Sequence, residues 1–424
     1  MAIDTPATIA VLGAGPIGLE AALYARFLGY DVLVFDRGDV AENPRHGWGH
    51  VRMFTPFHMN RSTLGLAALA AHDRDYRPPD DMSYLTGREW AEHYLAPLAG
   101  TDLLSDHLRL HTTVLAVGKE TFLKHESPGD EVRGDEGFRI LTRTADGQQQ
   151  IHRADVVIDT TGVFGNPNSL GAGGIPAIGE RQLRTQIEFG LPDLLGSARA
   201  DHAGRRVLLI GAGYSAATNV VALAELAREA PGTEVTWITR READQPGSGP
   251  IQRFENDRLH ERDQLARRAN KLAASGAEHV AHWPATVVER IERDSPDGPF
   301  RVTLAGDHAG EFEFDRVIAN VGWRPDVELF RELQVHLCYA TEGPMKLAAA
   351  MMGQTSADCL NQSACGPQTL LNPEMDFYVL GAKSFGRNSQ FLFATGLEQI
   401  RELFTIIGDR ESLNLYAGMA KLPQ

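Results

Sequence analysis

The chain has 424 residues, of which 43% are hydrophobic and 23% are charged, and its formal net charge is −15. This length allows two or three domains with a large core. The acidic balance disfavours nucleic acid and anionic membranes as partners, because both attract basic surfaces. No apolar run reaches the ~20 residues that span a bilayer, and the N-terminus shows no signal sequence, so we expect a cytoplasmic protein. The sequence leaves a homo-oligomer open.

A short apolar strand is predicted over residues 9–12, followed at once by a glycine-rich turn and a helix. Gly13 permits the tight turn, Gly15 lets the backbone approach a pyrophosphate, and Gly18 allows the helix to pack closely on the strand. Backbone N–H groups at the helix start, where the dipole favours negative charge, complete a phosphate site. The candidate cofactor residues of this turn are Gly13, Gly15, Pro16, Ile17 and Gly18.

A second strand, predicted over residues 31–36, ends in an acid. Asp36 lies 18 residues after Gly18, close to the spacing of about 20 that suits a hydrogen bond to a ribose hydroxyl. Arg37 follows directly and is a further candidate cofactor residue. Strand, turn, helix, strand and acid together predict a dinucleotide-binding unit. A glycine turn without a nucleotide is the plainer alternative.

The segment over residues 47–62 has little periodicity and is rich in histidine, arginine and aromatic residues, which favours a functional loop. A buried strand over residues 155–159 is closed by Thr161 and Gly162, two further cofactor candidates. The Gly/Pro-rich stretch over residues 164–176 then favours a passage between domains. Other predicted elements are helices over residues 63–72 and 86–98 and strands over residues 108–117, 138–144 and 149–153.

The strand–turn–helix unit is repeated further along the chain. A strand over residues 207–210 leads into a second glycine turn, in which Ala216 takes the place of the third glycine and still allows close packing. The strand over residues 234–239 ends in Arg240 and Arg241 and not in an acid. Arginine forks match phosphate oxygens, so the pair favours the 2′-phosphate of NADPH, with an exposed basic pair as the alternative. The candidate residues of the second turn are Gly211, Gly213, Tyr214, Ser215 and Ala216.

The last quarter of the chain is predicted to return to the first domain. A strand over residues 377–380 ends at Gly381, a loop follows to residue 388, and a helix is predicted from Ser389 to Ile407. Gly381, Arg387 and Asn388 are candidate cofactor residues, the last two at the helix start. The predicted domains are residues 1–198 and 317–424, forming a FAD-binding domain, and residues 199–316, forming an NADPH-binding domain inserted in it. The expected class is α/β, with two Rossmann-like, doubly wound parallel sheets.

In motif order the chain resembles the flavoproteins with two dinucleotide-binding domains, and within them the class B flavin monooxygenases and N-hydroxylases. The two glycine turns resemble their FAD and NADPH units. Thr161-Gly162 and Val321-Gly322, the latter with Pro325-Asp326, resemble the strand-end motifs that link their two domains. The segment over residues 57–62 is similar to the one that brings an asparagine near the flavin, here Asn60. One departure is clear: where the reductase branch has Gly-Asp at a C-terminal strand end, Ala382 and Lys383 follow Gly381 here.

The resemblance implies an enzyme that uses FAD and NADPH. NADPH would reduce FAD, oxygen would add at flavin C4a, and the hydroperoxide would transfer one oxygen atom to a nucleophilic N or S of a small molecule, an amine among the candidates. Cys359 and Cys365 are six positions apart, which is atypical for a redox dithiol, so buried inert thiols are favoured. Two alternatives stay open: a flavin oxidoreductase that passes electrons to a quinone or protein, and a non-catalytic nucleotide-sensing module.

Few side chains need to act as acids or bases in such chemistry, because the flavin carries the reaction. The candidate catalytic residues are Asn60, Arg52 and Trp48. Trp48, His50 and Arg52 are candidates to line the flavin, and Asn60 is a candidate to donate to the hydroperoxide or to hold NADP⁺, with loop packing the alternative for each. Tyr339, Thr341, Glu342 and Lys346 share a polar loop in which Glu342 is a candidate to hold a substrate amine, an ordinary surface carboxylate being the stronger alternative. The 15 histidines show no ligand spacing, so no metal is predicted.

Overall fold

The computed structural model describes residues 3–242, 249–275, 279–353, 360 and 364–418. The chain divides into two compact units. The first comprises Met1–Gly49, Pro56–Asn166 and Arg324–Gln424, and the second comprises His50–Thr55 and Pro167–Trp323. The chain thus passes between units within the Gly/Pro-rich stretch and again after Trp323, whereas the domain boundaries proposed from the sequence lie after residues 198 and 316.

The first unit is built on a five-stranded parallel sheet with the order β15-β7-β1-β2-β3. In its register Ala10 of β1 lies beside Leu33 of β2 on one side and Val157 of β7 on the other. Chain order reverses at β1, because β2 and β3 lie on one side of it and β7 and β15 on the other. The strands are β1 (Thr8–Leu12), β2 (Asp31–Phe35), β3 (Leu108–Arg109), β7 (Val156–Asp159) and β15 (Phe377–Val379).

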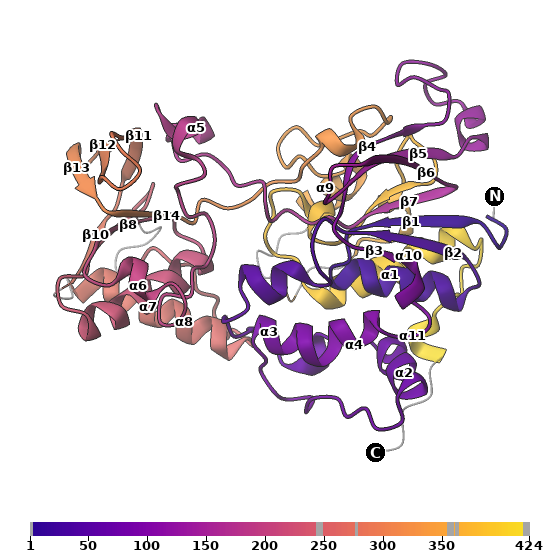
Figure 1. Cartoon of the computed structure of the whole chain (residues 1–424), viewed down its shortest axis with the longest axis horizontal. Coiled ribbons are helices and arrows are strands. Elements are labelled where there is room, and N and C mark those ends of the chain that lie inside the picture. The colour runs from indigo at the N-terminus through magenta and orange to yellow at the C-terminus, as the bar shows by residue number, and fades with distance from the viewer. Residues whose placement is uncertain (1–2, 243–248, 276–278, 354–359, 361–363, 419–424) are drawn as a thin grey trace. The chain divides into compact units, whose positions relative to one another are not determined.

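Helices α1 (Pro16–Phe27) and α10 (Phe393–Ile407) pack together beneath this sheet in the view of Figure 1. The rings of Tyr24 and Phe404 stack between them at 4.9 Å. An antiparallel sheet of β4 (Thr112–Lys119), β5 (Phe138–Thr144) and β6 (Gln149–Ala154) packs its apolar side chains with those of the parallel sheet. Leu12, Phe35, Phe138 and Phe377 belong to the resulting core.

The predicted helix over residues 63–72 is confirmed as α2 (Thr63–His72), capped by the Ser62 hydroxyl. The predicted helix over residues 86–98 is present as α3 (Gly87–Trp90), a π-helical turn (Ala91–Leu95) and α4 (Ala96–Ala99), all within the first unit. The predicted start of the C-terminal helix at Ser389 is wrong, because α10 begins at Phe393 after an extended Leu392. The first unit also contains α9 (Met345–Met352) and α11 (Leu415–Gly418).

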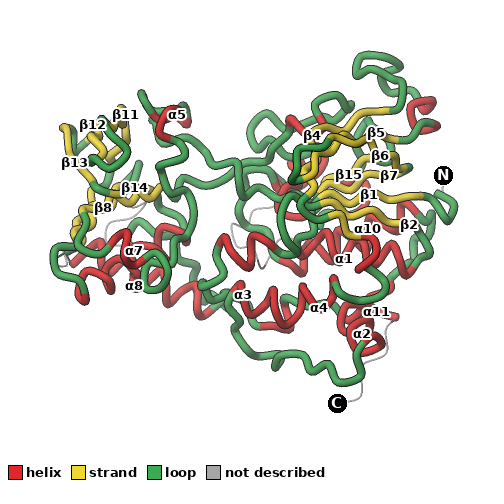
Figure 2. Tube along the Cα trace, in the orientation of Figure 1, coloured by secondary structure: helices red, strands yellow, loops and turns green. Residues whose placement is uncertain are grey.

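The second unit has a parallel sheet of its own, with the order β10-β9-β8-β14. Helices α7 (Tyr214–Glu229) and α8 (His260–Ser275) pack with it around Trp237. An antiparallel sheet of β11 (Thr286–Arg293), β12 (Phe300–Gly306) and β13 (Gly310–Phe314) lies beside the parallel sheet of this unit (Figure 2). The two sheets share a second hydrophobic core. The remaining elements are β8 (Arg206–Ile210), β9 (Glu234–Ile238), β10 (Val280–Trp283), β14 (Arg316–Ala319), α5 (Glu180–Leu183) and α6 (Arg199–His202).

The predicted fold class is confirmed, since each unit holds a Rossmann-like parallel sheet and the main segment of the second unit interrupts the first. The described residues contain no helix that combines the length and the apolarity required to cross a membrane.

Candidate functional site

The turn after β1 cannot accept side chains at two of its three glycines. A Cβ on Gly13, whose φ is +105°, would lie 2.9 Å from the Thr160 carbonyl oxygen, and a Cβ on Gly18 would lie 1.8 Å from the Gly13 carbonyl oxygen. A Cβ on Gly15 would meet no heavy atom within 4 Å. Gly13 and Gly18 therefore serve the tight turn and the packing of helix on strand, and Gly15 faces open space from which a ligand can approach.

The start of α1 offers backbone donors. Gly15 is its N-cap residue and supplies no side-chain hydrogen bond, and Pro16 occupies the first helical position. The first N–H groups of a helix lack intrahelical acceptors and lie at the positive end of the dipole, so this end suits an anion. Ile17 is buried there against Gly381, where a Cβ would lie 3.5 Å from the Ile17 side chain.

Asp36 holds the first turn from the end of β2. Its Oδ2 accepts a hydrogen bond from the Ala14 N–H at 2.7 Å, and its Oδ1 accepts one from the Gly38 N–H at 2.9 Å. Burial is the largest influence on this carboxyl and raises its pKa above the ordinary value. Asp36 is thus at the predicted place and shapes the turn. The neighbouring Arg37 reaches the Phe164 carbonyl oxygen at 3.5 Å.

The second glycine turn repeats this geometry in the second unit. A Cβ on Gly211, whose φ is +132°, would lie 2.3 Å from the Asn320 carbonyl oxygen, whereas Gly213 faces open space. Gly213 is the N-cap residue of α7, again without a side-chain cap. Ala216 is fully buried, as expected for the position of a third glycine, and the Tyr214 hydroxyl donates to the Gln252 carbonyl oxygen at 3.0 Å.

Arg240 and Arg241 follow the end of β9 at Ile238 by two and three positions, and both are exposed. The Thr239 hydroxyl donates to the Arg241 carbonyl oxygen at 3.1 Å and so fixes the backbone of the pair. Both residues therefore follow the carboxyl end of β9, the strand that pairs with β8, after which the second glycine turn begins. Their binding to a 2′-phosphate stays a prediction.

The loop over residues 47–62 is divided between the two units. Trp48 and Asn60 belong to the first unit, whereas His50 and Arg52 belong to the second. The Trp48 ring packs on Gly87, where a Cβ would lie 2.5 Å from it. Asn60 is 5% exposed, and its side-chain amide donates to the Pro56 carbonyl oxygen at 3.0 Å. The catalytic roles predicted for these residues are not tested by this geometry.

Asn60 is held further by Trp90, whose indole N–H donates to the Asn60 carbonyl oxygen at 2.8 Å. The position of this asparagine is thus fixed by its own loop and by α3.

The strand-end turn after β7 carries a network that sequence reasoning missed. The Thr161 N–H and hydroxyl both reach Asp159 Oδ1, at 3.0 and 2.7 Å. Lys383 Nζ donates to Asp159 Oδ2 at 2.6 Å and to the Thr161 hydroxyl at 2.9 Å. Lys383 and Asp159 have side-chain exposures of 1% and 0%. The signal in the sequence was an acid at the end of an apolar strand and a lysine directly after Gly381 and Ala382.

Arg387 and Asn388 do not begin a helix, which corrects the prediction. They lie in the loop before α10, where the Asn388 side-chain oxygen accepts from the Gln390 N–H at 2.9 Å. The predicted loop from Gly381 instead contains a 3₁₀ helix (Gly381–Phe385). Arg387 makes a bidentate pair with Glu342, at 2.9 and 3.0 Å. The guanidinium of Arg387 thus forms charge-assisted hydrogen bonds to both oxygens of Glu342, and a role for Glu342 in holding a substrate amine stays a prediction.

Glu20, on α1, is a second feature that the sequence analysis passed over. Its side chain is fully buried, its Oε1 accepts from the Tyr94 hydroxyl at 2.6 Å, and its Oε2 has no hydrogen-bond partner among the described residues. Burial raises the pKa of this carboxyl to about 7. A glutamate inside the Ala/Leu-rich helix of a predicted core was the available signal.

The chain's cysteines bear on the dithiol alternative. Cys338 is buried and forms no disulfide. Cys365 is half-buried, and Cys359 lies outside the described residues. The spacing argument about Cys359 and Cys365 therefore stays untested.

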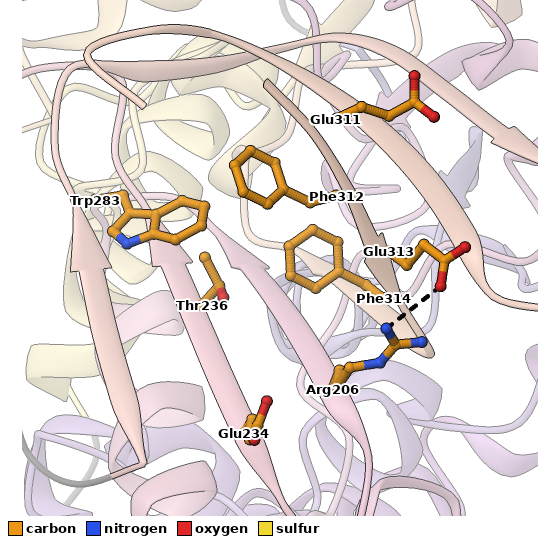
Figure 3. Close-up of a pocket in the computed structure, with 8 residues that line it drawn as sticks. All are labelled: Arg206, Glu234, Thr236, Trp283, Glu311, Phe312, Glu313 and Phe314. Carbon is orange, nitrogen blue, oxygen red and sulfur yellow. Dashed lines mark hydrogen bonds and ion pairs between the residues drawn. The ribbon is translucent and has the colours of Figure 1, made fainter. Parts of the chain in front are cut away.

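Two further surface features lie apart from these turns. A pocket of about 390 Å³ in the second unit has the rings of Trp283, Phe312 and Phe314 facing its interior, with Arg206 paired to Glu313 at its edge (Figure 3). None of its lining residues is a predicted cofactor residue. The remaining lining residues are Glu234, Thr236 and Glu311.

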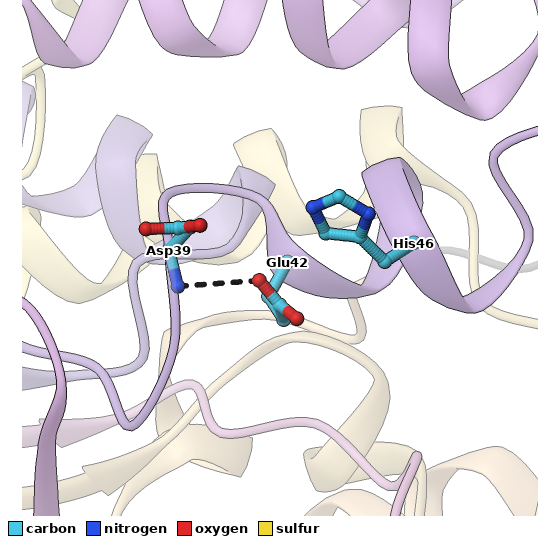
Figure 4. A group of neighbouring side chains, drawn as sticks. All are labelled: Asp39, Glu42 and His46. Carbon is cyan, nitrogen blue, oxygen red and sulfur yellow. Dashed lines mark hydrogen bonds between the residues drawn. The ribbon is translucent and has the colours of Figure 1, made fainter. Parts of the chain in front are cut away.

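The second feature is a surface cluster in the first unit. Asp39, Glu42 and His46 bring their potential ligand atoms within 4.8 Å of one another (Figure 4). Exposed acidic clusters are common in proteins that bind no ion there. The cluster therefore does not test the prediction that the protein binds no metal.

No protein-family model matches the chain, and a search of curated proteins found no match. Solved structures do match. A bacillithiol disulfide reductase from Bacillus cereus is 17% identical, with a TM-score of 0.66 over 96% of this chain and 99% of that one. A cadaverine monooxygenase from Erwinia amylovora is 15% identical, with a TM-score of 0.60 over 96% of each chain. An ornithine N-hydroxylase from Kutzneria sp. 744 is 15% identical, with a TM-score of 0.59 over 96% of this chain and 100% of that one.

Each likeness extends over 96% of this chain and so takes in residues of both units. At these identities it establishes the fold alone. The chain has the fold of flavoproteins with two dinucleotide-binding domains.

Proposed function

We propose that the protein is a FAD- and NADPH-dependent oxidoreductase, and specifically a monooxygenase. The observation that carries the proposal is the pair of glycine turns, each followed by an uncapped helix start and each at the carboxyl edge of its own parallel sheet. Phosphates of dinucleotides bind at such places. Among the structural neighbours, one is described as bound to FAD and another as holding reduced FAD, NADP⁺ and L-ornithine.

The first unit fits FAD. The N–H groups at the start of α1 would bind its pyrophosphate, and Gly15 leaves the room that this approach needs. Asp36, already fixed by two backbone N–H groups, retains lone pairs that a ribose hydroxyl can reach. Thr161 and Gly162 would line the same edge from β7. When bound, FAD would accept a hydride from NADPH and pass the electrons to oxygen.

The second unit fits NADPH. The start of α7 would bind the pyrophosphate of the coenzyme, and Arg240 and Arg241 would bind its 2′-phosphate through charge-assisted hydrogen bonds. Preference for NADPH over NADH then rests on these two side chains.

The proposed reaction balances with one molecule each of NADPH, O₂ and a nucleophilic amine or thioether. NADPH and a proton supply the two reducing equivalents, one oxygen atom enters the N or S of the substrate, and the other leaves as water. Asn60, rigidly held by Pro56 and Trp90, is the proposed residue that orients the reacting oxygen. Trp48 is proposed to exclude water, and Arg52 to bind coenzyme or substrate.

A second candidate is an NAD(P)H:acceptor reductase without oxygen transfer. The bacillithiol disulfide reductase likeness favours it, with a TM-score of 0.66. Electrons would then pass from reduced FAD to a quinone, a disulfide or a protein.

One experiment separates the two candidates. The FAD-loaded enzyme is given NADPH under ¹⁸O₂ with cadaverine, ornithine and a simple thioether as trial substrates, and then menadione under argon. Incorporation of one ¹⁸O per NADPH consumed supports the monooxygenase. Fast menadione reduction, with only hydrogen peroxide formed in oxygen, supports the reductase.

A further inference from the structure

Lys383 and Asp159 form a buried ion pair at the carboxyl edge of the first unit's parallel sheet. Asp159 is the last residue of β7, and Lys383 lies in the 3₁₀ helix that follows β15, the strand beside β7. The ammonium and carboxylate are 2.6 Å apart and almost completely shielded from solvent. Ligands of open parallel sheets bind at this edge, beside the strand where chain order reverses, which here is β1.

Lys383 and Asp159 both form hydrogen bonds to the turn that follows β7. Asp159 accepts from the N–H and the hydroxyl of Thr161, and Lys383 donates to that same hydroxyl. Thr161 itself is exposed, and a Cβ on Gly162, whose φ is +70°, would meet no heavy atom within 4 Å. The buried charges therefore fix the inner side of a turn whose outer side is open.

The same turn is joined to the first glycine turn. The Thr160 hydroxyl lies 2.8 Å from the Leu12 carbonyl oxygen and 3.1 Å from that of Gly13. The Thr160 hydroxyl thus joins the turn after β7 to the glycine turn after β1, and Lys383 contacts the turn after β7 through Asp159 and the Thr161 hydroxyl.

Stability alone is a weak reason for such a pair. Taking two charges out of water costs free energy that their attraction often fails to exceed, and apolar residues of similar volume are frequently as stable. The first unit has a second buried pair with the same shortest distance and the same exposures, Arg133 and Glu374, at 2.6 Å and with exposures of 1% and 0%. Glu374 precedes β15, so that pair lies at the opposite end of the strand from Lys383.

We propose that Lys383 is a positioning residue for the dinucleotide of the first unit: through Asp159 and the Thr161 hydroxyl it holds the Thr161–Gly162 turn in the conformation that contacts bound FAD. This inference rests on the proposed FAD site. Lys383 would thus position a turn of which the sequence analysis named only the residues Thr161 and Gly162.

The test replaces each of the two buried ion pairs, separately, with apolar residues. K383M/D159L removes both charges at the carboxyl edge, so no unpaired charge stays buried, and R133M/E374L does the same at the other end of β15 as the matched control. FAD dissociation constants are measured by flavin fluorescence quenching, together with the visible circular dichroism of bound FAD and the melting temperature of each apo-protein. K383R, which keeps the cation, serves as the conservative variant.

We expect K383M/D159L to bind FAD at least 10-fold more weakly than wild type and to show a changed visible dichroism. R133M/E374L should have a FAD dissociation constant within twofold of that of wild type. The dissociation constant of K383R should lie between those of R133M/E374L and K383M/D159L. FAD affinity and dichroism equal to wild type in K383M/D159L would overturn the inference. Should K383M/D159L not fold, the same measurements are made on T161V, which removes the hydroxyl that Lys383 contacts. FAD affinity and dichroism equal to wild type in T161V would then overturn the inference. Failure of wild-type protein to bind FAD would instead overturn the proposed function.

Discussion

Replacing Glu20 with glutamine should remove a large pH-dependent contribution to the stability of the first unit. Glu20 is fully buried, and its pKa is raised from 4.5 to about 7, chiefly by burial, while the Tyr94 and Ser62 hydroxyls pull it down. Between these two values the unfolded chain has lost the proton and the folded chain still holds it. The free energy of unfolding therefore falls as pH rises through this window and levels off above pH 7.

The magnitude follows from the shift. At about 1.4 kcal/mol per pKa unit, the rise to about 7 corresponds to about 3 kcal/mol of stability lost between pH 4.5 and pH 7. Glutamine has the same shape, and its carbonyl oxygen can accept the Tyr94 hydrogen bond that Glu20 Oε1 accepts at 2.6 Å. E20Q should match wild type near pH 5 and be more stable than wild type by up to about 3 kcal/mol at pH 8.

The assay is urea unfolding of the apo-protein at pH 5, 6, 7 and 8, followed by fluorescence and circular dichroism. Glu402 also has a pKa raised to about 7, but it is present in both proteins and cancels in the difference. E92Q, at an exposed glutamate of the same unit, is the control and should differ little from wild type at every pH. A stability difference between E20Q and wild type that is the same at pH 5 and pH 8 would show that the raised pKa of Glu20 does not govern this pH dependence.

Three further predictions concern the proposed sites. G18A should abolish FAD binding, because the added Cβ would lie 1.8 Å from a backbone oxygen, whereas G118A, with open space around it, should bind FAD normally in the same titration. R240A/R241A should raise the KM for NADPH at least 10-fold and leave the KM for NADH within twofold; equal changes would contradict the 2′-phosphate role. N60A should lower product formed per NADPH oxidised several-fold with little effect on NADPH-driven flavin reduction, and unchanged coupling would remove Asn60 from the oxygen-transfer step.

The dinucleotide-binding cores of both units could be predicted from the sequence because their signals are local. An apolar run, glycines at fixed intervals and a helix start follow one another without interruption, so the strand, the turn and the close packing at Gly18 are all encoded within about ten residues. The same holds for the turn from Gly211 to Ala216. A terminal acid or arginine pair after the next strand adds a second local signal.

The buried polar networks could not be predicted, because their partners are far apart in the sequence. Lys383 and Asp159 are separated by 224 positions, and only the pairing of β7 with β15 brings them together. Tyr94 reaches Glu20 across 74 positions in the same way. The predicted start of α10 at Ser389 is too early, because a local turn at Asn388 and the extended Leu392 interrupt the helical pattern of the sequence.

Binding of FAD at the first glycine turn and of NADPH at the second underlies every role proposed above. Both are tested by anaerobic mixing of NADPH with protein reconstituted with FAD, followed by absorbance near 450 nm. We expect stoichiometric FAD binding by wild type and rapid bleaching by NADPH, faster than by NADH. Protein that stays colourless in excess FAD, or bound FAD that NADPH leaves oxidised, would contradict this expectation.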